Sequence, residues 1–307
     1  MSTNNIRKNE IKRWWDSPRN LRWDKFYETN DLNSYMISKR LEKTLEILDP
    51  IVDKNKDILE LGCGAGQSSE KILLMGHKYI GIDISEQLIS CAKERCKNYI
   101  ESKKAKFFIQ TVDESLQIKS NSQDIVLIIG MLQYVDNLDF CFNEIKRILK
   151  KDGHILICQT NMYHVHDFFL PRSLLVKLSY LFLNEEYEIS NSIKSVLLET
   201  KLNKLFKFNK NSSIMKSGFM TKGYIKRQYN FKKRLMSLTK LSKLLKIYKF
   251  SVVETTGAPF FYTDNKFFKP LFSLLDYIAL IFLKIPILSS IKHLANNVII
   301  VGKNDSV

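Results

Sequence analysis

Three glycines at every second position follow a short apolar run, and a carboxylate stands 17 residues further along the chain. Residues 57–66 read Asp-Ile-Leu-Glu-Leu-Gly-Cys-Gly-Ala-Gly, and the next apolar run, 79–83, ends in Asp83. Glycines without a Cβ let the backbone turn sharply and approach a ligand closely. A carboxylate at the end of a strand can accept hydrogen bonds from both hydroxyls of a ribose. The pattern predicts a nucleotide-type ligand, and the alternative is a glycine turn without one.

The spacing of the glycines separates this turn from the dinucleotide fingerprint. That fingerprint has the form G-x-G-x-x-G, whereas the three glycines here form G-x-G-x-G and Gln67 stands at the third fingerprint position. An acid, Glu60, lies two residues before the first glycine. The segment 67–75 can form a helix whose free N–H groups point back at the ligand. The sequence therefore predicts a strand, a tight turn and a helix around the ligand.

The elements that position these residues alternate between strand and helix. Strands are expected at 57–61, 79–83, 106–110, 123–129 and 153–159, and helices at 67–75, 85–103 and 137–150. Strands that are apolar throughout and alternate with helices indicate a parallel sheet with both faces covered, in a doubly wound α/β fold. A helix at 237–246 and strands at 250–255 and 297–302 complete the pattern. Such sheets bind ligands where the strand order reverses, here between the first and fourth strands.

The chain divides into four regions. They are a helical N-terminal lid (1–50), an α/β core (51–159), a basic helical cap (160–236) and the C-terminal part of the core (237–307), with a helical insertion at 257–296. A length of 307 residues suits one large domain with appended caps. The basic cap shows no recurring strand signal.

Almost all of the net charge lies in one segment. The formal charge is +16 at pH 7, and residues 194–249 contain sixteen Lys and Arg against one acid, Glu199. This segment is either a surface for an anionic partner or a consequence of a composition rich in Lys, Asn and Ile. Aromatic side chains between its bases are compatible with nucleic acid, with a phosphate-bearing small molecule or with an anionic bilayer.

The apolar stretch 266–284 bears on membrane contact. Its unbroken part, 271–283, has 13 residues and contains Asp276, whereas a membrane-spanning helix needs about 20 apolar residues. A buried cap helix is expected, with an interfacial helix as the alternative. The five cysteines form no C-x-x-C pair, and the N-terminus lacks the apolar run of a signal peptide. These features predict a cytoplasmic protein and leave peripheral contact with the inner face of the membrane open.

Three sequence blocks together resemble the class I S-adenosylmethionine-dependent methyltransferases, in particular the type 11 and quinone-pathway members. The blocks are 60–66 with Asp83, 123–136 and 144–153, the last with Asp152 in place of the usual proline. The resemblance covers residues 30–159 well and 237–302 more loosely. It implies a seven-stranded Rossmann-like sheet whose last strand is antiparallel. It also implies S-adenosylmethionine as the methyl donor and S-adenosylhomocysteine as the product.

The resemblance implies a set of cofactor contacts. The residues concerned are Arg40, Glu60, Gly62, Cys63, Gly64, Asp83, Ile84, Asp113, Glu114, Gly130, Met131 and Gln133. Glu60 is expected to hold the methionine ammonium through water, and Asp83 the ribose hydroxyls. Arg40 is placed to bind the methionine carboxylate, with a solvated helix arginine as the alternative. Trp23 and Tyr27 are candidates for a lid over the cofactor, although packing is the commoner role for such side chains.

The adenine end departs from the family pattern. Ile84 is expected to pack on the ring, and a side chain near Asp113 or Glu114 to meet its amino group. Val112 stands where the family often has an Asp. This leaves three alternatives. Asp113 can contact the adenine amino group from the neighbouring position, a backbone group can make that contact instead, or Asp113 is only a solvated loop acid.

The end of the fourth strand is expected to form the methyl-donor end, lined by Gly130, Met131 and Gln133. Many relatives have Glu-His where this chain has Gln133-Tyr134, so an obvious acid–base pair is missing. Methyl transfer from a sulfonium depends mainly on alignment and exclusion of water. A general base helps when the nucleophile is a hydroxyl.

Two histidines after the fifth strand, His164 and His166, are the candidate catalytic bases. Structural or substrate-contacting roles are the alternatives. Their spacing could also suit a metal, but no third ligand is evident, and no metal site is predicted.

These observations predict a methyltransferase that O-methylates a small or lipid-linked acceptor under the caps, such as a sugar or a quinone-like ring. A cap that is both basic and apolar favours a lipid-linked, anionic acceptor over nucleic acid. One alternative is an RNA methyltransferase, although the chain has no Asn/Asp-Pro-Pro-aromatic tetrapeptide. Another is a non-catalytic module that binds the cofactor or a partner. The sequence does not indicate an oligomeric state.

Overall fold

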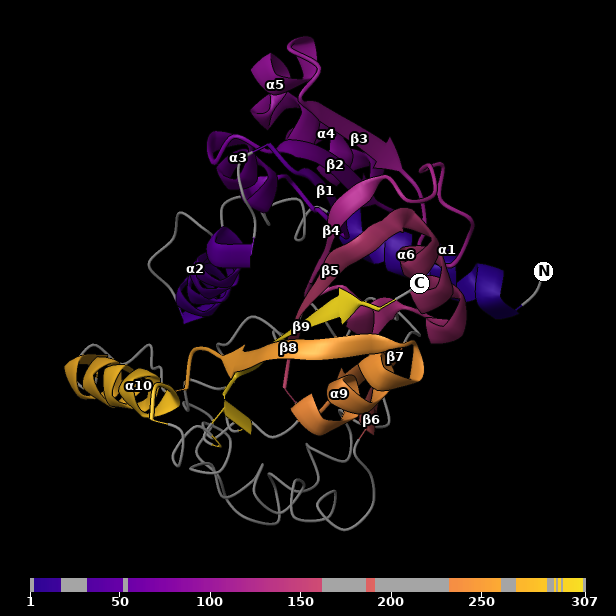
Figure 1. The fold of residues 1–307 in the computed structure, drawn as a ribbon. Helices are drawn as coiled ribbons and strands as arrows, with labels where there is room; N and C mark the ends of the chain where they lie inside the picture. The colour runs from indigo at the N-terminus through magenta and orange to yellow at the C-terminus, as the bar shows by residue number, and fades with distance from the viewer. Residues whose placement is uncertain are drawn as a thin grey trace.

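The computed structural model describes residues 3–17, 32–51, 55–161, 186–190, 232–260, 269–285, 290, 292–293 and 295–305. A twisted sheet crosses the centre of the molecule, and helices cover both of its faces (Figure 1).

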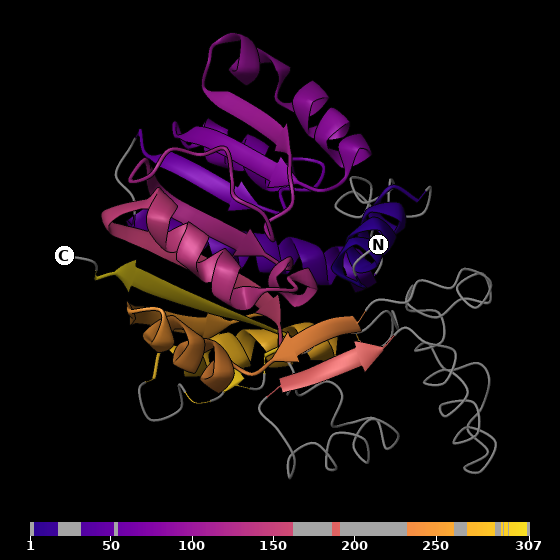
Figure 2. The same cartoon turned by 90° about the vertical axis from the view of Figure 1, so that its right-hand side faces the viewer.

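Seven strands form this sheet. They are β1 (Asp57–Leu61), β2 (Lys78–Asp83), β3 (Ala105–Ile109), β4 (Gln123–Ile129), β5 (Leu149–Thr160), β8 (Phe250–Gly257) and β9 (Asn297–Asn304). Their order is β3-β2-β1-β4-β5-β9-β8. Strands β1 to β5 pair in parallel, and β9 is antiparallel to both β5 and β8, so its arrow in Figure 2 runs against those of the parallel strands. The predicted doubly wound fold is confirmed, with the order reversing between β1 and β4.

Helices pack on both faces because the strands are apolar on both faces. On one face, α6 (Leu138–Ile148) and α9 (Leu238–Ile247) cover strand residues that include Leu59 and Leu61. On the other face, α2 (Leu32–Ile51), α3 (Gln67–Leu74) and α4 (Glu86–Arg95) cover the alternate residues, among them Ile58 and Leu127. The sheet is therefore buried between two cores, which holds the carboxyl ends of its strands at fixed positions.

Side-chain caps set where several helices begin. Ser85, Asn137 and Ser237 each accept a hydrogen bond from a backbone N–H three residues further on, at the starts of α4, α6 and α9. The single helix expected over 85–103 is instead two helices, α4 and α5 (Lys97–Glu101). The backbone leaves the helical conformation at Cys96, where φ is −106° and ψ is 20°.

A two-stranded sheet lies in the region expected to be a basic helical cap. Strands β6 (Glu186–Ser190) and β7 (Lys232–Met236) pair in antiparallel fashion. The helical expectation is wrong for these ten residues. Strand β7 shows no alternation of polar and apolar residues, and β6 alternates over five residues only, so neither gives a strong strand signal. Met236 is fully buried in the core beside α9, which anchors the pair to the main sheet.

The N-terminal region contains helix α1 (Thr3–Trp15) and helix α2, as predicted. Trp23 and Tyr27, the candidate lid residues, and His164 and His166, the candidate bases, lie outside the described residues. Their roles stay predictions.

The C-terminal insertion contains helix α10 (Lys269–Leu283). The expectation that it is buried is wrong for one of its faces, because Leu271, Leu274 and Tyr277 are each more than half exposed. None of the helices in the described part of the chain has the length and apolar character to cross a bilayer.

Candidate cofactor and acceptor site

The glycine turn joins the carboxyl end of β1 to the neighbouring strands. Gly62 and Gly64 have φ values of +79° and +55°, the left-handed region that favours glycine. The N–H of Gly62 donates to the carbonyl of Ile82 at 2.7 Å. A Cβ on Gly62 would lie 2.5 Å from Cγ of Met131, which follows β4. The turn is therefore held in a crowded cradle in which a larger residue does not fit.

Asp83 ties the turn to the end of β2. Its Oδ2 accepts the N–H of Gly64 at 2.9 Å, and its Oδ1 accepts the N–H of Ser85 at 2.9 Å. Burial raises the pKa of Asp83 above its ordinary value, while these two N–H groups lower it. A carboxylate has about four acceptor positions, so this one retains acceptor positions for the two hydroxyls of a ribose. The predicted role of Asp83 therefore fits its geometry.

Glu60 lies beneath the turn with only 2% of its surface exposed. Its Oε2 accepts hydrogen bonds from the hydroxyls of Ser68 and Tyr79, both at 2.6 Å. Burial raises the pKa of Glu60 to about 7, while these hydrogen bonds and the charge of Arg40 oppose the shift. The carboxylate is thus poised between its neutral and charged forms, and a nearby ammonium would favour the charged form.

Cys63 is a buried thiol in the same turn. Cys96 and Cys158 are buried in the adjacent core. Burial raises the pKa of Cys63 well above its ordinary value, so this side chain remains neutral. All five cysteines are free, and four of them are buried.

Arg40 reaches the carboxyl end of β4 from helix α2. A Cβ on Gly130 would lie 2.6 Å from Nη1 of Arg40, so the guanidinium rests directly against this glycine. The Nε atom of Arg40 is buried and has no hydrogen-bond partner. A buried donor without a partner is costly, and a carboxylate is the group that a guanidinium binds best. The arginine is half-buried, and its place fits a methionine carboxylate.

The methyl-donor end is shaped by a short turn after β4. The amide of Gln133 donates to the carbonyl of Gly130 at 2.9 Å, which closes the 3-10 helix η2 (Leu132–Tyr134). Gln133 is thus occupied in holding this turn, while Met131 packs over Gly62. Both residues lie just after β4, where the Gln133 side chain is bonded to a backbone carbonyl. Their contacts with the cofactor stay predictions.

A buried amide lies near the end of β5, the strand beside β4. Gln159, in β5, has no exposed surface, and its Oε1 has no hydrogen-bond partner. Its Nε2 donates at 3.4 Å to the carbonyl of Arg234 in β7. Sequence reasoning missed this residue, because a single Gln in an apolar strand gives no signal of its own.

Helix α1 closes the adenine end. Ile11 and Trp14 pack with Ile84, and Trp15 meets Tyr134 edge to face with ring centroids 5.7 Å apart. This cluster joins helix α1 to the segments that follow β2 and β4.

Polar contacts fix α1 in this position. Asp16 accepts a hydrogen bond from the Ser85 hydroxyl at 2.6 Å. The backbone N–H of the same serine donates to Asp83. Lys8 forms an ion pair with Glu114 at 2.9 Å. Sequence reasoning missed Asp16, which has no motif around it.

Asp113 is half-buried and binds a neighbouring loop. Its Oδ1 accepts the N–H groups of Asp136 and Asn137 at 3.1 and 3.0 Å, which ties the loop after β3 to the loop after β4. The contacts of Asp113 and Glu114 with an adenine amino group stay predictions.

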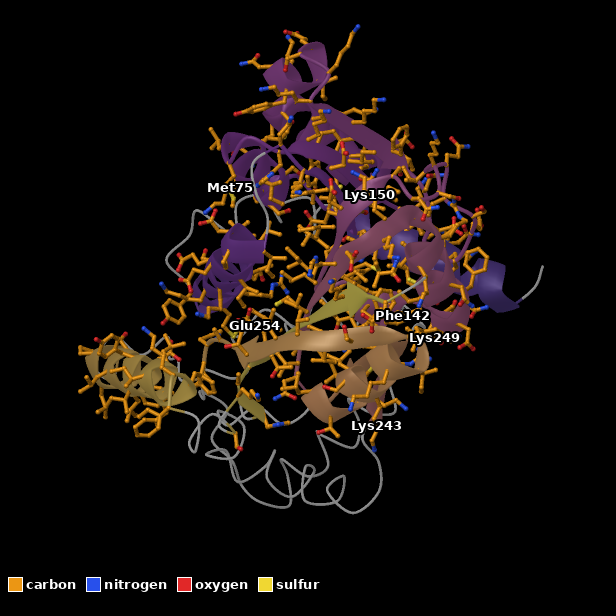
Figure 3. All side chains as sticks on the ribbon, in the orientation of Figure 1. Met75, Phe142, Lys150, Lys243, Lys249 and Glu254 are labelled. Atoms are coloured by element: carbon orange, nitrogen blue, oxygen red, sulfur yellow. The ribbon has the colours of Figure 1, made fainter. Side chains whose placement is uncertain are left out.

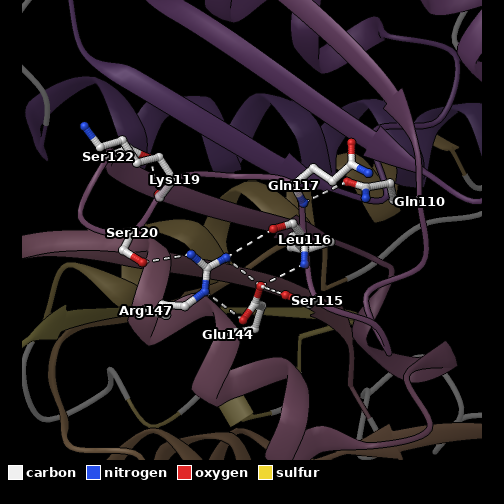
Figure 4. Close-up of polar contacts among 9 residues, drawn as sticks. All are labelled: Gln110, Ser115, Leu116, Gln117, Lys119, Ser120, Ser122, Glu144 and Arg147. Carbon is white, nitrogen blue, oxygen red and sulfur yellow. Dashed lines mark hydrogen bonds and ion pairs between the residues drawn. The ribbon is translucent and has the colours of Figure 1, made fainter.

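A half-buried ion pair holds the same loop from below (Figure 4). Glu144 of α6 accepts the N–H of Leu116 at 2.8 Å and forms an ion pair with Arg147 at 2.6 Å. Arg147 in turn donates to the carbonyl of Leu116 at 3.2 Å. The Arg147 hydrogen bond is the main cause that holds the pKa of Glu144 below its ordinary value. The adenine-side loop is therefore fixed to the core, although it has no regular structure.

The residues of this edge fit S-adenosylmethionine. They provide a carboxylate for the ribose, a buried carboxylate for the ammonium and a guanidinium for the carboxylate. Within the described residues, no group of three or more His, Cys, Asp or Glu side chains is arranged to hold a metal.

Comparison with known proteins agrees with this arrangement. Residues 59–157 match the family model described as a methyltransferase domain, type 11. The chain is 27% identical over 168 residues to the ubiquinone biosynthesis O-methyltransferase of Pelagibacter ubique, covering 52% of this chain and 67% of that protein. It is 26% identical over 120 residues to the demethylmenaquinone methyltransferase of Tropheryma whipplei, covering 39% of this chain and 47% of that protein. The match thus spans less than half of the second relative.

Solved structures share the fold at low sequence identity. The 1,6-didemethyltoxoflavin-N1-methyltransferase of Burkholderia thailandensis, with bound S-adenosylhomocysteine, has a TM-score of 0.57 and 12% identity, covering 99% of this chain and 89% of that one. The magnesium protoporphyrin IX methyltransferase of Synechocystis PCC 6803, also with S-adenosylhomocysteine, has a TM-score of 0.54 and 13% identity, covering 97% and 98%. At this identity these structures show a shared fold. The family match makes residues 59–157 a class I methyltransferase domain, of enzyme class EC 2.1.1, whose methyl donor is S-adenosylmethionine.

Proposed function

We propose that this protein transfers a methyl group from S-adenosylmethionine to an oxygen of a small or lipid-linked acceptor. The observation that carries the proposal is the Asp83 carboxylate, which accepts the N–H of Gly64 at 2.9 Å and so joins the glycine turn to a ribose-binding acid. The names of the relatives support a hydroxylated quinone-like ring as the acceptor.

In the proposed step, the bound cofactor supplies an electrophilic methyl group. The acceptor oxygen forms a bond to that methyl carbon, the carbon–sulfur bond breaks, and its electron pair remains on sulfur. The acceptor hydroxyl loses its proton to a base or to water. Arg40 and Asp83 would hold the two ends of the donor, and Gly130 and Met131, which pack on Arg40 and Gly62, would line its centre. Alignment and exclusion of water supply most of the rate in such a displacement.

The side chains expected to line the acceptor side, at the ends of β4 and β5, suit positioning of the acceptor more than transfer of its proton. Segments 130–134 and 159–161, at the ends of β4 and β5, contain no His, Asp, Glu or Lys. Their polar side chains are amides and hydroxyls, which orient a ring hydroxyl without ionising. An acceptor that is acidic enough to lose its proton readily, such as a catechol-like ring, suits this environment.

The first test is calorimetric titration of S-adenosylhomocysteine into the wild-type protein and Asp83→Ala. Loss of two charge-assisted hydrogen bonds predicts affinity at least about thirtyfold weaker in the variant. Glu86→Ala, which removes an exposed carboxylate at the start of α4, is the control and is expected to bind like the wild type. Equal binding by Asp83→Ala would falsify the assignment of the ribose site.

The second test is transfer of a labelled methyl group from S-adenosylmethionine to a catechol that carries a short prenyl tail. Label is expected in an ether that organic solvent extracts, and Asp83→Ala is expected to give none above background. Label in RNA but in no small molecule would favour the RNA alternative. Cofactor binding without transfer to any offered acceptor would favour the non-catalytic module.

A further inference from the structure

Helix α10 turns its apolar side outward. Leu271, Leu274 and Tyr277 are 51%, 54% and 62% exposed, and Ile281 and Phe282 are 41% and 37% exposed. Spacings of three and four residues place these side chains along one side of a helix. In Figure 3, sticks surround α10 at the end of the molecule away from the α6 side of the sheet. Contiguous exposed apolar side chains mark an interaction surface in most soluble proteins.

The opposite side of α10 faces the core, where Leu280 and Leu283 also pack, and its contacts fix the rotation of the helix. Asp276 is 4% exposed, and its carboxylate accepts the N–H of Phe260 at 2.6 Å and the hydroxyl of Tyr35 at 3.3 Å. Ala279 packs beside Phe260 and Ala295. Turning the apolar side inward would expose or unpair this buried acid, which is costly. The outward face is therefore a stable feature of the fold.

The charges of α10 stand at its ends. Between residues 269 and 285 the charged residues are Lys269, Asp276 and Lys284, and the acid is the buried one. The face between the two lysines carries Leu, Ile, Phe and Tyr. An apolar strip with basic ends and aromatic side chains is typical of helices that lie in the headgroup region of a bilayer. The formal charge of +16 adds attraction to anionic lipids.

We propose that α10 docks this protein on an anionic lipid bilayer, lying in the plane of the interface. A helix of 15 residues is about 22 Å long, so it can lie on the membrane but cannot cross it. This contact deepens the proposed function, because it brings the chain to the surface from which a lipid-linked acceptor is reached. The membrane contact itself does not depend on the proposed methyl transfer. Only the statement that the acceptor is lipid-linked rests on the proposed function.

The test is co-sedimentation of the full chain with vesicles of phosphatidylcholine and phosphatidylglycerol in equal parts. Leu274→Glu is expected to lower the partition coefficient about tenfold. The substitution removes an apolar side chain that the bilayer would bury, and it adds a charge that anionic lipid repels. Leu74→Glu is the matched control, since Leu74 is 71% exposed on α3 and the substitution is the same. The control is expected to bind vesicles like the wild type.

A second variant separates apolar burial from charge repulsion. Leu274→Ser/Tyr277→Ser leaves the net charge unchanged and is expected to bind several-fold more weakly than the wild type. Neutral phosphatidylcholine vesicles are expected to bind the wild type more weakly than anionic ones. Titration with S-adenosylhomocysteine confirms that each variant is folded, and this readout tests the cofactor site independently of the membrane.

Three outcomes would overturn the proposal. One is a wild-type chain that does not sediment with anionic vesicles. Another is a Leu274→Glu variant that sediments as well as Leu74→Glu. The third is a wild-type dimer in solution that Leu274→Glu dissociates, since the apolar face would then belong to an interface between two copies of the chain.

Discussion

The two halves of the site differ in how their polar groups are satisfied. On the cofactor half, around β1 and β2, Glu60 and Asp83 accept short hydrogen bonds from neighbouring hydroxyls and N–H groups. On the acceptor half, around β4 and β5, the Oε1 atom of Gln159 is buried without a partner. In the first half both carboxylates are paired before any ligand arrives, although the Nε2 atom of Gln67, at the start of α3, is buried without a partner. The second has polar capacity that an acceptor can use.

This difference has a physical reason. A cofactor common to the whole family presents the same ribose and the same amino acid group, so a rigid cradle recognises it at little cost in ordering. Arg40 is the link between the halves, because it rests on Gly130 of the acceptor half and faces the charge of Glu60 in the cofactor half. Substitutions in the cofactor half should therefore affect donor binding strongly, and substitutions in the acceptor half should affect it little.

The largest effect is expected from Gly62→Ala. A Cβ at this position would lie 2.5 Å from Met131, in a backbone conformation that alanine rarely adopts. Affinity for S-adenosylhomocysteine should fall about a hundredfold or more, because the turn must move to relieve the contact. Titration calorimetry measures it.

Gly76→Ala is the matched control for this substitution. Gly76 also has a positive φ, of +93°, but a Cβ there would have no neighbour within 4 Å. It should lower the free energy of unfolding by about 1–2 kcal/mol and leave cofactor affinity unchanged. Equal losses of affinity in both variants would mean that backbone strain alone matters and that the close approach to Met131 does not.

The next effect concerns Arg40→Met. Its guanidinium is expected to form a charge-assisted pair with the methionine carboxylate, so its removal should weaken S-adenosylhomocysteine binding about thirtyfold. Lys43→Met, on the same helix, removes only a surface pair with Glu46 at 2.7 Å, which contributes little. If the two variants bind the cofactor equally well, Arg40 has a packing role and another group holds the carboxylate.

A smaller effect is expected from pH. Burial raises the pKa of Glu60 to about 7, and its charged form is the one that attracts the ammonium of the cofactor. Affinity for S-adenosylhomocysteine should therefore rise about tenfold between pH 6 and pH 8 and then level off. Glu60→Gln should bind more weakly at pH 8 and show little dependence on pH over the same range.

The stability of the cofactor-free protein should change in the opposite direction. In the folded state the pKa of Glu60 is about 7, whereas the ordinary pKa of a glutamate is 4.5. Between these two pKa values the folded state binds more protons than the unfolded state. The contribution of protonated Glu60 to stability is therefore lost as pH rises from about 5 to about 7. Thermal unfolding of wild type and Glu60→Gln across this range tests the assignment, and parallel curves would contradict it.

The sequence was sufficient to predict the cofactor half and much of the sheet. Strands buried on both faces are continuous apolar runs with glycine at their ends, so β1 and β4 are predicted with their observed bounds. The tie between Asp83 and the glycine turn follows from both standing at the carboxyl ends of adjacent parallel strands. Local patterns of this kind survive without knowledge of the rest of the fold.

The features that sequence reasoning missed depend on contacts between distant segments. Asp16 and Ser85 are 69 residues apart and meet only because α1 lies over α4. The outward face of α10 could not be predicted, since 271–283 is apolar on nearly all sides and its rotation is set by Asp276 meeting Tyr35. The short strand β7 is identified only by its pairing.

The smallest effect is expected in the acceptor half, from Gln159→Met. The Oε1 atom of Gln159 is buried without a partner, and its Nε2 makes only a long hydrogen bond of 3.4 Å. A methionine of similar volume removes the unpaired atom, so the free energy of unfolding should stay the same or rise by about 1 kcal/mol. Chemical denaturation measures this change.

The same variant distinguishes a structural amide from one that meets the acceptor. If Gln159 orients the acceptor, Gln159→Met should keep the affinity for S-adenosylhomocysteine and lower kcat/KM for methyl transfer about tenfold, since one hydrogen bond to the substrate is lost. A variant that is more stable, binds the cofactor normally and turns over more slowly would show that the unpaired oxygen is retained for function, at a cost in stability. A variant that is less stable and equally active would place Gln159 with the packing of β7 and would remove the contrast between the two halves.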